Sequence, residues 1–250
     1  MIGIIGGSGI SALLKSRKFS ECKTNTPYGT VYLYSGKIDK MDCVFVLRHG
    51  KNHQLPPHKV NYHANIWALK QHGITEAIAI YAVGIISKFT PGDLVVAEDF
   101  IGFNAPITFF DDFKNGIKHT DFSEPYPKEM QTKLFRAAEN AAIPLKKNGI
   151  IATTHGPRFE TRAEIKALKI IGANLVSMTN AYEATLFREL EIPVAGLCIA
   201  TNYASGISRT GTNCTNKTKK LSHKEVIDMV AKKEHEVNRI INEFVKLKKL

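Results

Sequence analysis

Five short segments of the sequence combine residue types that can bind an anion or a flat polar ring. The first is Gly6-Gly7-Ser8-Gly9, which follows the apolar run Ile2 to Ile5. Glycines allow successive backbone N–H groups to converge on one anion, and the Ser8 hydroxyl adds a donor, so this segment can hold a phosphate. A tight turn without a ligand is the alternative.

The same glycines also fit the pattern G-x-G-x-x-A of a dinucleotide-binding turn, from Gly7 to Ala12. That site needs an acidic residue about 20 residues further on to bind the ribose. The region from Thr24 to Thr30 has no such residue, and no G-K-[ST] follows the glycines. The sequence therefore argues against a dinucleotide cofactor.

The second segment is Arg48-His49-Gly50, which follows the apolar run Cys43 to Leu47. A guanidinium offers a planar fork of donors that matches phosphate oxygens, and the end of a sheet strand is where α/β proteins bind ligands. A surface ion pair is the alternative. A metal site is disfavoured because two prolines interrupt this histidine-rich region, which has no cysteine or carboxylate cluster; its histidines are His49, His53, His58 and His63.

The third segment runs from Gly156 to Thr161 and places Phe159 beside Glu160. An aromatic face and a carboxylate together can stack a flat heterocycle and accept a ring N–H from it. The alternative is that Glu160 only favours the N-terminus of the helix that Thr161 begins.

The fourth and fifth segments are Ser177-Met178-Thr179-Asn180 with Glu183, and Thr201-Asn202-Tyr203-Ala204; each follows an apolar run. Small polar donors and a carboxylate can hold sugar hydroxyls and phosphate. An asparagine amide can read a base edge with the converse pattern of donor and acceptor. Turn or capping roles are the alternative for both segments.

The elements that must position these segments follow an alternating pattern of strands and helices. Several apolar runs lack alternation with polar residues, as in strands that are covered on both faces. The predicted strands are Ile2 to Ile5, Val31 to Tyr34, Cys43 to Leu47, Ala77 to Ala82, Leu94 to Ala97, Ile150 to Thr153, Leu175 to Met178 and Val194 to Ala200. This pattern predicts one α/β domain, residues 1–250, around a central mixed sheet.

Three helices are predicted between or after these strands. One spans Tyr62 to His72 before Gly73. The second starts at a capping box of Thr161 with Glu164 and runs to Gly172. The third follows a second box, Ser222 with Glu225, and keeps its apolar residues to one stripe, namely Val226, Val230, Val237, Ile241 and Val245.

Composition limits the classes of function. The chain has 250 residues, 34 Lys+Arg against 23 Asp+Glu, a formal net charge of +11, and 44% hydrophobic residues, which describes a globular protein. The basic balance admits polyanions, anionic membranes or small phosphorylated partners. The N-terminal run lacks a basic region, and the longest apolar run, Ala77 to Ile86, is too short to span a bilayer. We therefore expect a cytoplasmic protein without a membrane partner.

A nucleic-acid-binding module is the alternative that charge alone suggests. Such a module needs a basic face interleaved with exposed aromatic residues. The aromatic-bearing motifs of this chain also contain Glu160 and Glu183. The sequence therefore favours an enzyme for a small phosphorylated substrate.

Taken together, the motifs resemble the trimeric family of purine nucleoside phosphorylases and methylthioadenosine phosphorylases. The agreement is collinear over most of the chain and comprises Ile4 to Gly9, Thr26-Pro27-Tyr28-Gly29, Arg48-His49-Gly50, Lys59 to Ile66, Pro91-Gly92-Asp93, Gly156 to Thr161, Met178-Thr179 with Glu183, and Thr201-Asn202. The resemblance implies a single α/β domain around a mixed, barrel-like sheet and a homotrimer with sites near subunit boundaries. It also implies reversible phosphorolysis, in which inorganic phosphate is the co-substrate and no cofactor is required.

The resemblance carries roles over to individual residues. It implies that phosphate is bound by Ser8, Arg48, His49, the backbone at Ala82, and Thr179. The expected positive charge for the phosphate is that of Arg48, aided by His49. The resemblance further implies that the nucleoside is contacted by Phe159 as a stacking ring, Met178 at the ribose, Glu183 in the sugar and phosphate neighbourhood, His223 at the 5′ end and His119 in a neighbouring subunit's site. The catalytic residues expected are Asn202, Glu160 and His49.

Two base-reading positions distinguish the branches of this family. Members that act on adenosine-type nucleosides use Ser where this chain has Glu160 and Asp where it has Asn202, and the inosine and guanosine type uses Glu and Asn. Glu160 can accept from N1–H of a 6-oxopurine, and Asn202 can donate to O6 and N7. The resemblance thus implies a 6-oxopurine substrate, with a methylthioadenosine phosphorylase as the alternative.

The 5′ substituent of the substrate is open between methylthio and hydroxyl. Arg48-His49-Gly50 and Lys59-Val60-Asn61-Tyr62 look more like the methylthioadenosine branch, so the combination is similar to a methylthioinosine phosphorylase. The chain departs from the family near the phosphate loop, where Tyr81, Val83 and Ile85 replace smaller residues and Asn180-Ala181-Tyr182 replaces a common T/S-V-P. We expect this loop to differ in detail.

Overall fold

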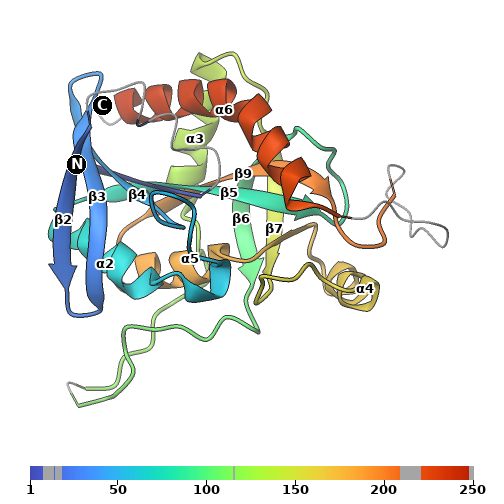
Figure 1. The fold of residues 1–250 in the computed structure, drawn as a ribbon, viewed down its shortest axis with the longest axis horizontal. Coiled ribbons are helices and arrows are strands. Elements are labelled where there is room, and N and C mark those ends of the chain that lie inside the picture. The colour runs from blue at the N-terminus through green and yellow to red at the C-terminus, as the bar shows by residue number, and fades with distance from the viewer. Residues whose placement is uncertain (8–13, 15–18, 115, 209–220, 248–250) are drawn as a thin grey trace.

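The computed structural model describes residues 1–7, 14, 19–114, 116–208 and 221–247, and Figure 1 shows their arrangement. The strands are β1 (Ile2–Gly6), β2 (Ser20–Thr26), β3 (Gly29–Ile38), β4 (Met41–Leu47), β5 (Glu76–Ile85), β6 (Leu94–Ile101), β7 (Lys146–Thr153), β8 (Leu175–Ser177) and β9 (Val194–Tyr203). The helices are η1 (Pro57–Lys59), α2 (Tyr62–Gln71), α3 (Lys128–Asn140), α4 (Arg162–Ile170), α5 (Asn180–Glu189) and α6 (His223–Lys246). None of the described helices has the length and apolar character needed to span a membrane.

The strands form one mixed sheet in the order β2-β3-β4-β1-β5-β8-β7-β6-β9. An additional pairing of β5 with β9 closes the last five strands into a barrel. Strand β1 is parallel to both β4 and β5, and β9 is parallel to β5, whereas β8 is antiparallel to β5. The predicted α/β fold around a mixed, barrel-like sheet is confirmed.

Helices cover both faces of the sheet. Helices α3 and α6 pack together on one side, and α2 and α5 pack together on the other (Figure 1). On the first side a buried apolar cluster contains Ile4 and Phe244, and on the second side another contains Ile5 and Phe187. Because neighbouring residues of a strand point to opposite faces, Ile4 and Ile5 bury the two faces of β1. This double burial is why several strands read as unbroken apolar runs.

The predicted strands and helices are present, and the capping box of Thr161 with Glu164 forms in both directions. The helix that it starts ends at Ile170. Gly172, the predicted end of this helix, lies two residues further on and has a positive φ of 102°. The sequence pattern did not predict β2, α3 and α5. Strand β2 is polar because it lies at one end of the sheet order and buries none of its residues fully.

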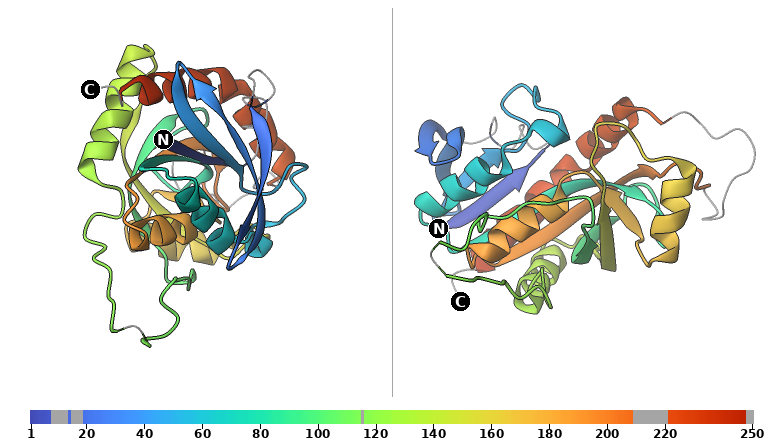
Figure 2. Two further views of the ribbon diagram at one scale, coloured as in Figure 1. Left: turned by 90° about the vertical axis from the view of Figure 1, so that its left-hand side faces the viewer. Right: turned by 90° about the horizontal axis from the view of Figure 1, so that it is seen from below.

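The connection between β6 and α3 projects from the rest of the molecule (Figure 2). It exposes apolar side chains, including Phe103 at 85% and Ile117 at 76% of their surface. Its inner part is held by Glu189 of α5, which accepts from the Thr108 hydroxyl at 2.6 Å and from Phe109 N at 2.6 Å. The projecting connection is therefore anchored although it leaves the body of the fold.

Candidate active site

A cavity of about 430 Å³ lies where the ends of several strands meet. Parallel β1, β4 and β5 bring their carboxyl ends to one edge of the sheet, which is where α/β proteins bind ligands. The cavity is lined by nine of the residues that the sequence analysis selected: Arg48, His49, Ala82, Phe159, Glu160, Met178, Thr179, Asn202 and His223. The fold thus brings distant residues to one site: among these nine, Arg48 and His223 are 175 positions apart in the sequence.

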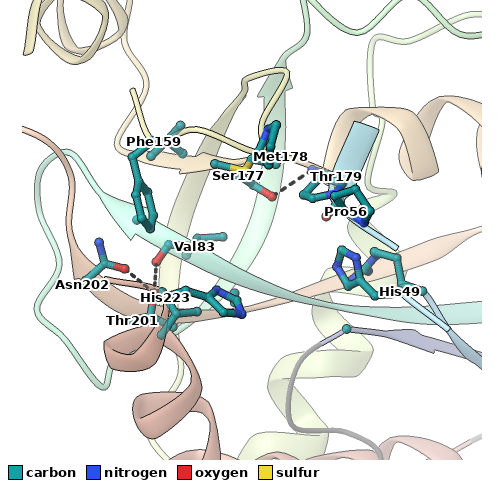
Figure 3. Close-up of a pocket in the computed structure, with 18 of the residues that line it drawn as sticks. His49, Pro56, Val83, Phe159, Ser177, Met178, Thr179, Thr201, Asn202 and His223 are labelled. Atoms are coloured by element: carbon teal, nitrogen blue, oxygen red, sulfur yellow. Dashed lines mark hydrogen bonds between the residues drawn. The ribbon is translucent and has the colours of Figure 1, made fainter. Parts of the chain in front are cut away.

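The cavity has two chemically different ends. Phe159 and Asn202 lie at one end, and His49, Pro56 and Thr179 lie at the other, with Met178 between them (Figure 3). The first end has an aromatic ring and groups that can both donate and accept hydrogen bonds. The second end has a buried cation, a helix N-terminus and a hydroxyl. The cavity is therefore shaped for a ligand that carries a flat polar ring at one end and meets an anion at the other.

A β-bulge in β9 positions Asn202 at the ring-binding end. The register with β5 pairs Val83 with Ala200 but Gly84 with Asn202, so Thr201 is an extra residue. The Thr201 hydroxyl lies 3.1 Å from the Val83 carbonyl and 2.8 Å from Asn202 Oδ1. A bulge re-aims the side chain that follows it, which explains how a residue near the end of a barrel strand faces the cavity.

The hydrogen bonds of Asn202 leave it one free donor and one free acceptor. Its Nδ2 donates to the Tyr203 carbonyl at 3.1 Å, and its Oδ1 accepts from Thr201. An amide has two N–H donors and two oxygen lone pairs. Asn202 thus presents one N–H and one lone pair to a ligand, with its orientation fixed by the barrel wall.

Glu160 supplies an acceptor at the same end. It is only 6% exposed, and one of its oxygens, Oε1, accepts from the Thr154 hydroxyl at 2.7 Å. Burial raises the pKa of this carboxyl, and the hydrogen bond from Thr154 partly opposes the rise. The other oxygen has capacity to accept from a ring N–H. The expected pairing of Glu160 with Phe159 at one cavity is therefore present.

The loop before Glu160 approaches Met178 closely at Gly156. This glycine has a φ of 65°, and a Cβ atom at its position would lie 2.7 Å from Met178 Sδ. No residue with a side chain fits there without moving Met178. The glycine thus lets the loop press the methionine against the middle of the cavity.

At the anion end, Arg48 forms a buried ion pair with Glu183. Its Nε donates to Oε1 at 2.5 Å and its Nη2 donates to Oε2 at 2.7 Å, while Nη1 donates to the Ile80 carbonyl at 3.0 Å. Arg48 is 3% exposed and Glu183 is fully buried. Burial alone would lower the pKa of Arg48, but the charge of Glu183 raises it. Arg48 is therefore a fixed cation with two of its five N–H groups left to donate.

This ion pair corrects the expected charge of the site. From the sequence, Arg48 is the positive charge expected to attract phosphate, but the buried carboxylate of Glu183 offsets that charge. Glu183 itself does not line the cavity but contacts Arg48, which does, so its expected place in the sugar and phosphate neighbourhood stays a prediction. The sequence could not reveal the pair because the two residues are 135 positions apart.

His49 is a neutral group beside Arg48. Its Nδ1 lies 2.8 Å from the Leu55 carbonyl, so Nδ1 carries the proton and Nε2 is left as an acceptor. Burial and the charge of Arg48 lower the pKa of His49 to about 3. A Cβ atom at Gly7 would lie 3.0 Å from the imidazole and 3.1 Å from Arg48 Nη1. The missing side chain at Gly7 thus lets both groups approach the segment after β1.

Thr179 brings a helix N-terminus to the anion end. It is the residue before α5, it is 7% exposed, and its side chain makes no capping hydrogen bond to that helix. Its backbone N–H points to the Ser177 hydroxyl at 3.3 Å. The Thr179 hydroxyl can therefore donate to a ligand, and the partial positive charge of the helix N-terminus favours an anion there.

Two further histidines extend from His49 along the cavity wall. The centre of the His53 ring lies 4.5 Å from that of His49 and 5.8 Å from that of His223. The rings of His53 and His223 are stacked, with 25° between their planes. Burial lowers the pKa of His53 most, and the charges of His223 and Arg48 lower it further. The sequence analysis considered His53 only as a metal ligand and missed its place in this cavity. Within the described ranges, no group of three or more His, Cys, Asp or Glu residues could hold a metal ion.

Some predicted site residues lie elsewhere. Ser8 falls outside the described residues. His119 is exposed on the connection between β6 and α3, beside Phe113, and does not line the cavity of its own chain. Of the positions that depart from the family pattern, Val83 lines the cavity, whereas Tyr81 and Ile85 are buried behind it.

Comparisons with known proteins match almost the entire chain. Residues 1–246 match the model of the phosphorylase superfamily. The chain is similar to 6-oxopurine nucleoside phosphorylase of Pyrococcus furiosus, with 41% identity over 96% of this chain and 90% of that protein. It is 40% identical to a probable S-methyl-5′-thioinosine phosphorylase of Methanopyrus kandleri, over 82% of this chain and 80% of that protein. Among solved structures, methylthioadenosine phosphorylase from Schistosoma mansoni in complex with adenine is similar, with a TM-score of 0.88, 30% identity, and coverage of 99% of this chain and 91% of that one.

Proposed function

Because this chain belongs to the phosphorylase superfamily, we propose that it catalyses the phosphorolysis of 6-oxopurine nucleosides, either 5′-methylthioinosine or inosine and guanosine. The family resemblance found in the sequence is confirmed, and the chain is an enzyme of the purine nucleoside phosphorylase type. The observation that carries the choice of base is that Glu160, Asn202 and Phe159 line one cavity. Release of a free purine base assigns the reaction to purine salvage.

The hydrogen-bonding pattern of the ring-binding end favours a 6-oxopurine. Such a base presents N1–H as a donor next to O6 as an acceptor, whereas a 6-aminopurine reverses both. Glu160 accepts from N1–H with the oxygen that Thr154 does not occupy. Asn202 donates to O6 or N7 with the N–H that Tyr203 does not occupy. A 6-aminopurine places its unprotonated N1 opposite the free oxygen of Glu160, which leaves that buried oxygen unpaired at a cost of about 1 to 3 kcal/mol. Asn202 discriminates less, because its free lone pair can accept from a 6-amino group.

The anion end is suited to hold phosphate as the nucleophile. A phosphate oxygen forms the new bond to C1′ while the bond from C1′ to N9 of the base breaks, and the base leaves with the electron pair. Two N–H groups of Arg48 and the Thr179 hydroxyl donate to the phosphate, and His49 Nε2 accepts from a protonated phosphate oxygen. Positioning of phosphate and stabilisation of the charge on the departing base carry the catalysis.

His223 and His53 with apolar neighbours form the wall that we assign to the 5′ end of the sugar. Leu55, two residues after His53, and Leu221 and Val226, within three residues of His223, also line the cavity. Imidazoles can bond a 5′-hydroxyl, and the aliphatic side chains can cover a 5′-methylthio group. Both substrates therefore belong in the test.

The test is a direct assay of the purified protein with inosine, 5′-methylthioinosine and 5′-methylthioadenosine, each with and without inorganic phosphate. We expect release of hypoxanthine from the 6-oxo compounds, with formation of the sugar 1-phosphate, only when phosphate is present. Base release that does not depend on phosphate would mean hydrolysis and would overturn the proposal. Preferred cleavage of 5′-methylthioadenosine would show instead that the chain is a methylthioadenosine phosphorylase and that the base-reading argument is wrong.

We further propose that the enzyme works as a cytoplasmic homotrimer. The support is the family resemblance together with exposed apolar side chains on the connection that carries His119, such as Phe103 and Ile117. Light scattering after size exclusion should give a mass of three times 27.8 kDa. A single-chain mass at micromolar concentration, in an active preparation, would contradict this assignment.

A further inference from the structure

Three buried polar atoms lie behind the anion end without a hydrogen-bond partner of acceptable geometry among the described residues. They are Tyr81 Oη in β5, Tyr126 Oη just before α3, and Asn180 Nδ2 in the first turn of α5. All three residues are fully buried. Burying a polar group without a partner destabilises a fold, so native structures keep few of them and each needs an explanation.

These three groups adjoin one another and lead to the Arg48–Glu183 pair. Tyr126 interacts with both Asn180 and Tyr81, and Tyr81 interacts with Glu183. The Tyr81 ring also lies under the guanidinium of Arg48, with 5.1 Å between the ring centre and Cζ. The groups therefore form a continuous series from α5, through the core, to the cation that lines the cavity.

The hydroxyl groups in this series remain neutral donors. Burial raises the pKa of Tyr81 well above its usual range and also raises that of Tyr126. Burial raises the pKa of Glu183 as well, whereas Arg48 and the Tyr81 hydroxyl lower it. Tyr81 thus helps to keep Glu183 ionised, and an ionised Glu183 is what holds Arg48 with two hydrogen bonds.

The surrounding packing keeps the series in place. A Cβ atom at Gly196 would lie 3.0 Å from the Tyr126 ring, so the absence of a side chain there makes room for the ring. The Thr153 hydroxyl donates to Asn180 Oδ1 at 2.6 Å and lies 3.2 Å from Ala181 N. Neither Tyr126 nor Asn180 can turn its polar atom to solvent.

We propose that Tyr81, Tyr126 and Asn180 are positioning residues for the anion site, and that they orient the Arg48–Glu183 pair so that the two remaining N–H groups of Arg48 face the cavity. Tyr81 covers one face of the guanidinium, a contact that is favourable for a cation on an aromatic ring, and supports the carboxylate behind it. Tyr126 and Asn180 in turn orient the Tyr81 hydroxyl. The proposal deepens the proposed function and rests on it for the identity of the anion.

The test compares Tyr81→Phe and Tyr126→Phe, which keep the rings and remove the hydroxyls. Calorimetric titration measures binding of inorganic phosphate, of sulfate and, separately, of hypoxanthine. We expect about fivefold weaker binding of both anions for Tyr81→Phe and about twofold to threefold weaker binding for Tyr126→Phe, the size of a weak and indirect polar interaction. Hypoxanthine binding should not change, and KM for phosphate should rise without a change in KM for the nucleoside.

The melting temperature separates a positioning role from a purely structural one. Because the hydroxyls lack well-formed hydrogen bonds, the phenylalanine variants should melt at the same or a higher temperature than the wild type while binding anions more weakly. Tyr34→Phe is the matched control, since Tyr34 donates to Glu21 on β2, remote from the cavity, and should leave anion binding unchanged. Lower melting temperatures with unchanged anion affinity in both variants would overturn the proposal.

The binding and activity measurements also separate the positioning role from the proposed function. If the wild type binds sulfate and phosphate but does not cleave nucleosides, the proposed function fails, while weaker anion binding by Tyr81→Phe still supports the positioning role. If the wild type is active and Tyr81→Phe binds both anions within twofold of the wild type, the positioning role fails and the proposed function stands. Failure of the wild type to bind either anion would overturn both.

Discussion

The substitution Glu160→Gln keeps the size of the side chain but replaces one carboxylate oxygen by an amide that donates. Glu160 Oε1 accepts from the Thr154 hydroxyl at 2.7 Å, so the glutamine oxygen is held by Thr154 and its NH₂ group takes the place of the oxygen that faces the base. N1–H of a 6-oxopurine then meets a donor instead of an acceptor. The unprotonated N1 of a 6-aminopurine meets the donor that it needs.

The size of the effect follows from the hydrogen bond that is lost. A hydrogen bond to a charged group contributes about 1.5 to 3 kcal/mol, which corresponds to a fall in kcat/KM for 6-oxo substrates of about 10- to 150-fold. The same substitution should raise kcat/KM for the matching 6-amino nucleoside. The ratio of the 6-oxo to the 6-amino specificity constant should therefore change by more than either constant does alone.

The fold itself should tolerate this substitution. Burial raises the pKa of Glu160, which means that the folded state disfavours the ionised carboxylate that is present at neutral pH. A neutral amide removes this unfavourable burial, so the free energy of unfolding at pH 7 should be unchanged or higher. A fall in activity then cannot be attributed to unfolding.

The assay measures phosphate-dependent release of hypoxanthine and of adenine from matched 5′-methylthio nucleosides, with the melting temperature determined on the same samples. Glu164→Gln is the control, because the Glu164 side chain is 41% exposed and accepts from Arg158 and from the N-terminus of its own helix. The control should lower the melting temperature and leave the 6-oxo to 6-amino ratio unchanged. A folded Glu160→Gln protein whose ratio changes by less than about fivefold, below the effect of one hydrogen bond to a charged group, would show that Glu160 does not read the base.

Three further outcomes are expected. The substitution Arg48→Met leaves a buried carboxylate without its cation, so urea titration should show a loss of about 3 to 5 kcal/mol in stability; a loss below about 1 kcal/mol would show that the pair is not energetically coupled. The pKa of His49 is about 3 in the folded chain and about 6.5 when unfolded. Between pH 3 and pH 6.5 His49 therefore binds a proton in the unfolded state but not in the folded state, so without ligand the free energy of unfolding should rise by up to about 1.4 kcal/mol per pH unit. His49→Gln should flatten that slope. An equal slope in both proteins would contradict the lowered pKa of His49. In Gly156→Ala the new methyl group must displace Met178, so KM for the nucleoside should rise. Gly73 has a similar positive φ and nothing within 4 Å of an added Cβ, so Gly73→Ala should share only the loss of about 1 to 2 kcal/mol in stability from the backbone conformation. Equal KM values in the two variants would argue against a role for the contact of Gly156 with Met178.

The sequence could predict which segments meet at the site because each lies at the end of an apolar run. Buried parallel strands bring their carboxyl ends to one edge of a sheet, so Arg48 after β4 and Asn202 near the end of β9 had to lie near the same edge. Met178 follows β8, which is antiparallel to β5, so this rule does not explain its place. The capping box at Thr161 likewise predicted where α4 begins. The residues that form such a capping motif lie within a few positions of one another, so the sequence alone shows the whole motif.

Features that depend on pairing across the chain could not be predicted in the same way. The contact of Arg48 with Glu183 joins residues 135 positions apart, and it changed the site from a charged to a nearly neutral one. The series from Asn180 to Tyr81 is equally non-local, although unusual residues at both positions gave a signal that the loop differs. Strand β2 escaped prediction because an edge strand buries too little apolar surface to leave a pattern.

The extra residue in β9 has a consequence for how base preference can change over time. Val83 pairs with Ala200 and Gly84 pairs with Asn202, so deleting Thr201 would leave both pairs in register and would keep the following residues on their present faces. The deletion would remove the local bend and the hydroxyl that lies 2.8 Å from Asn202 Oδ1. A single-codon deletion would thus change the aim of the amide that reads the base without shifting the rest of the strand.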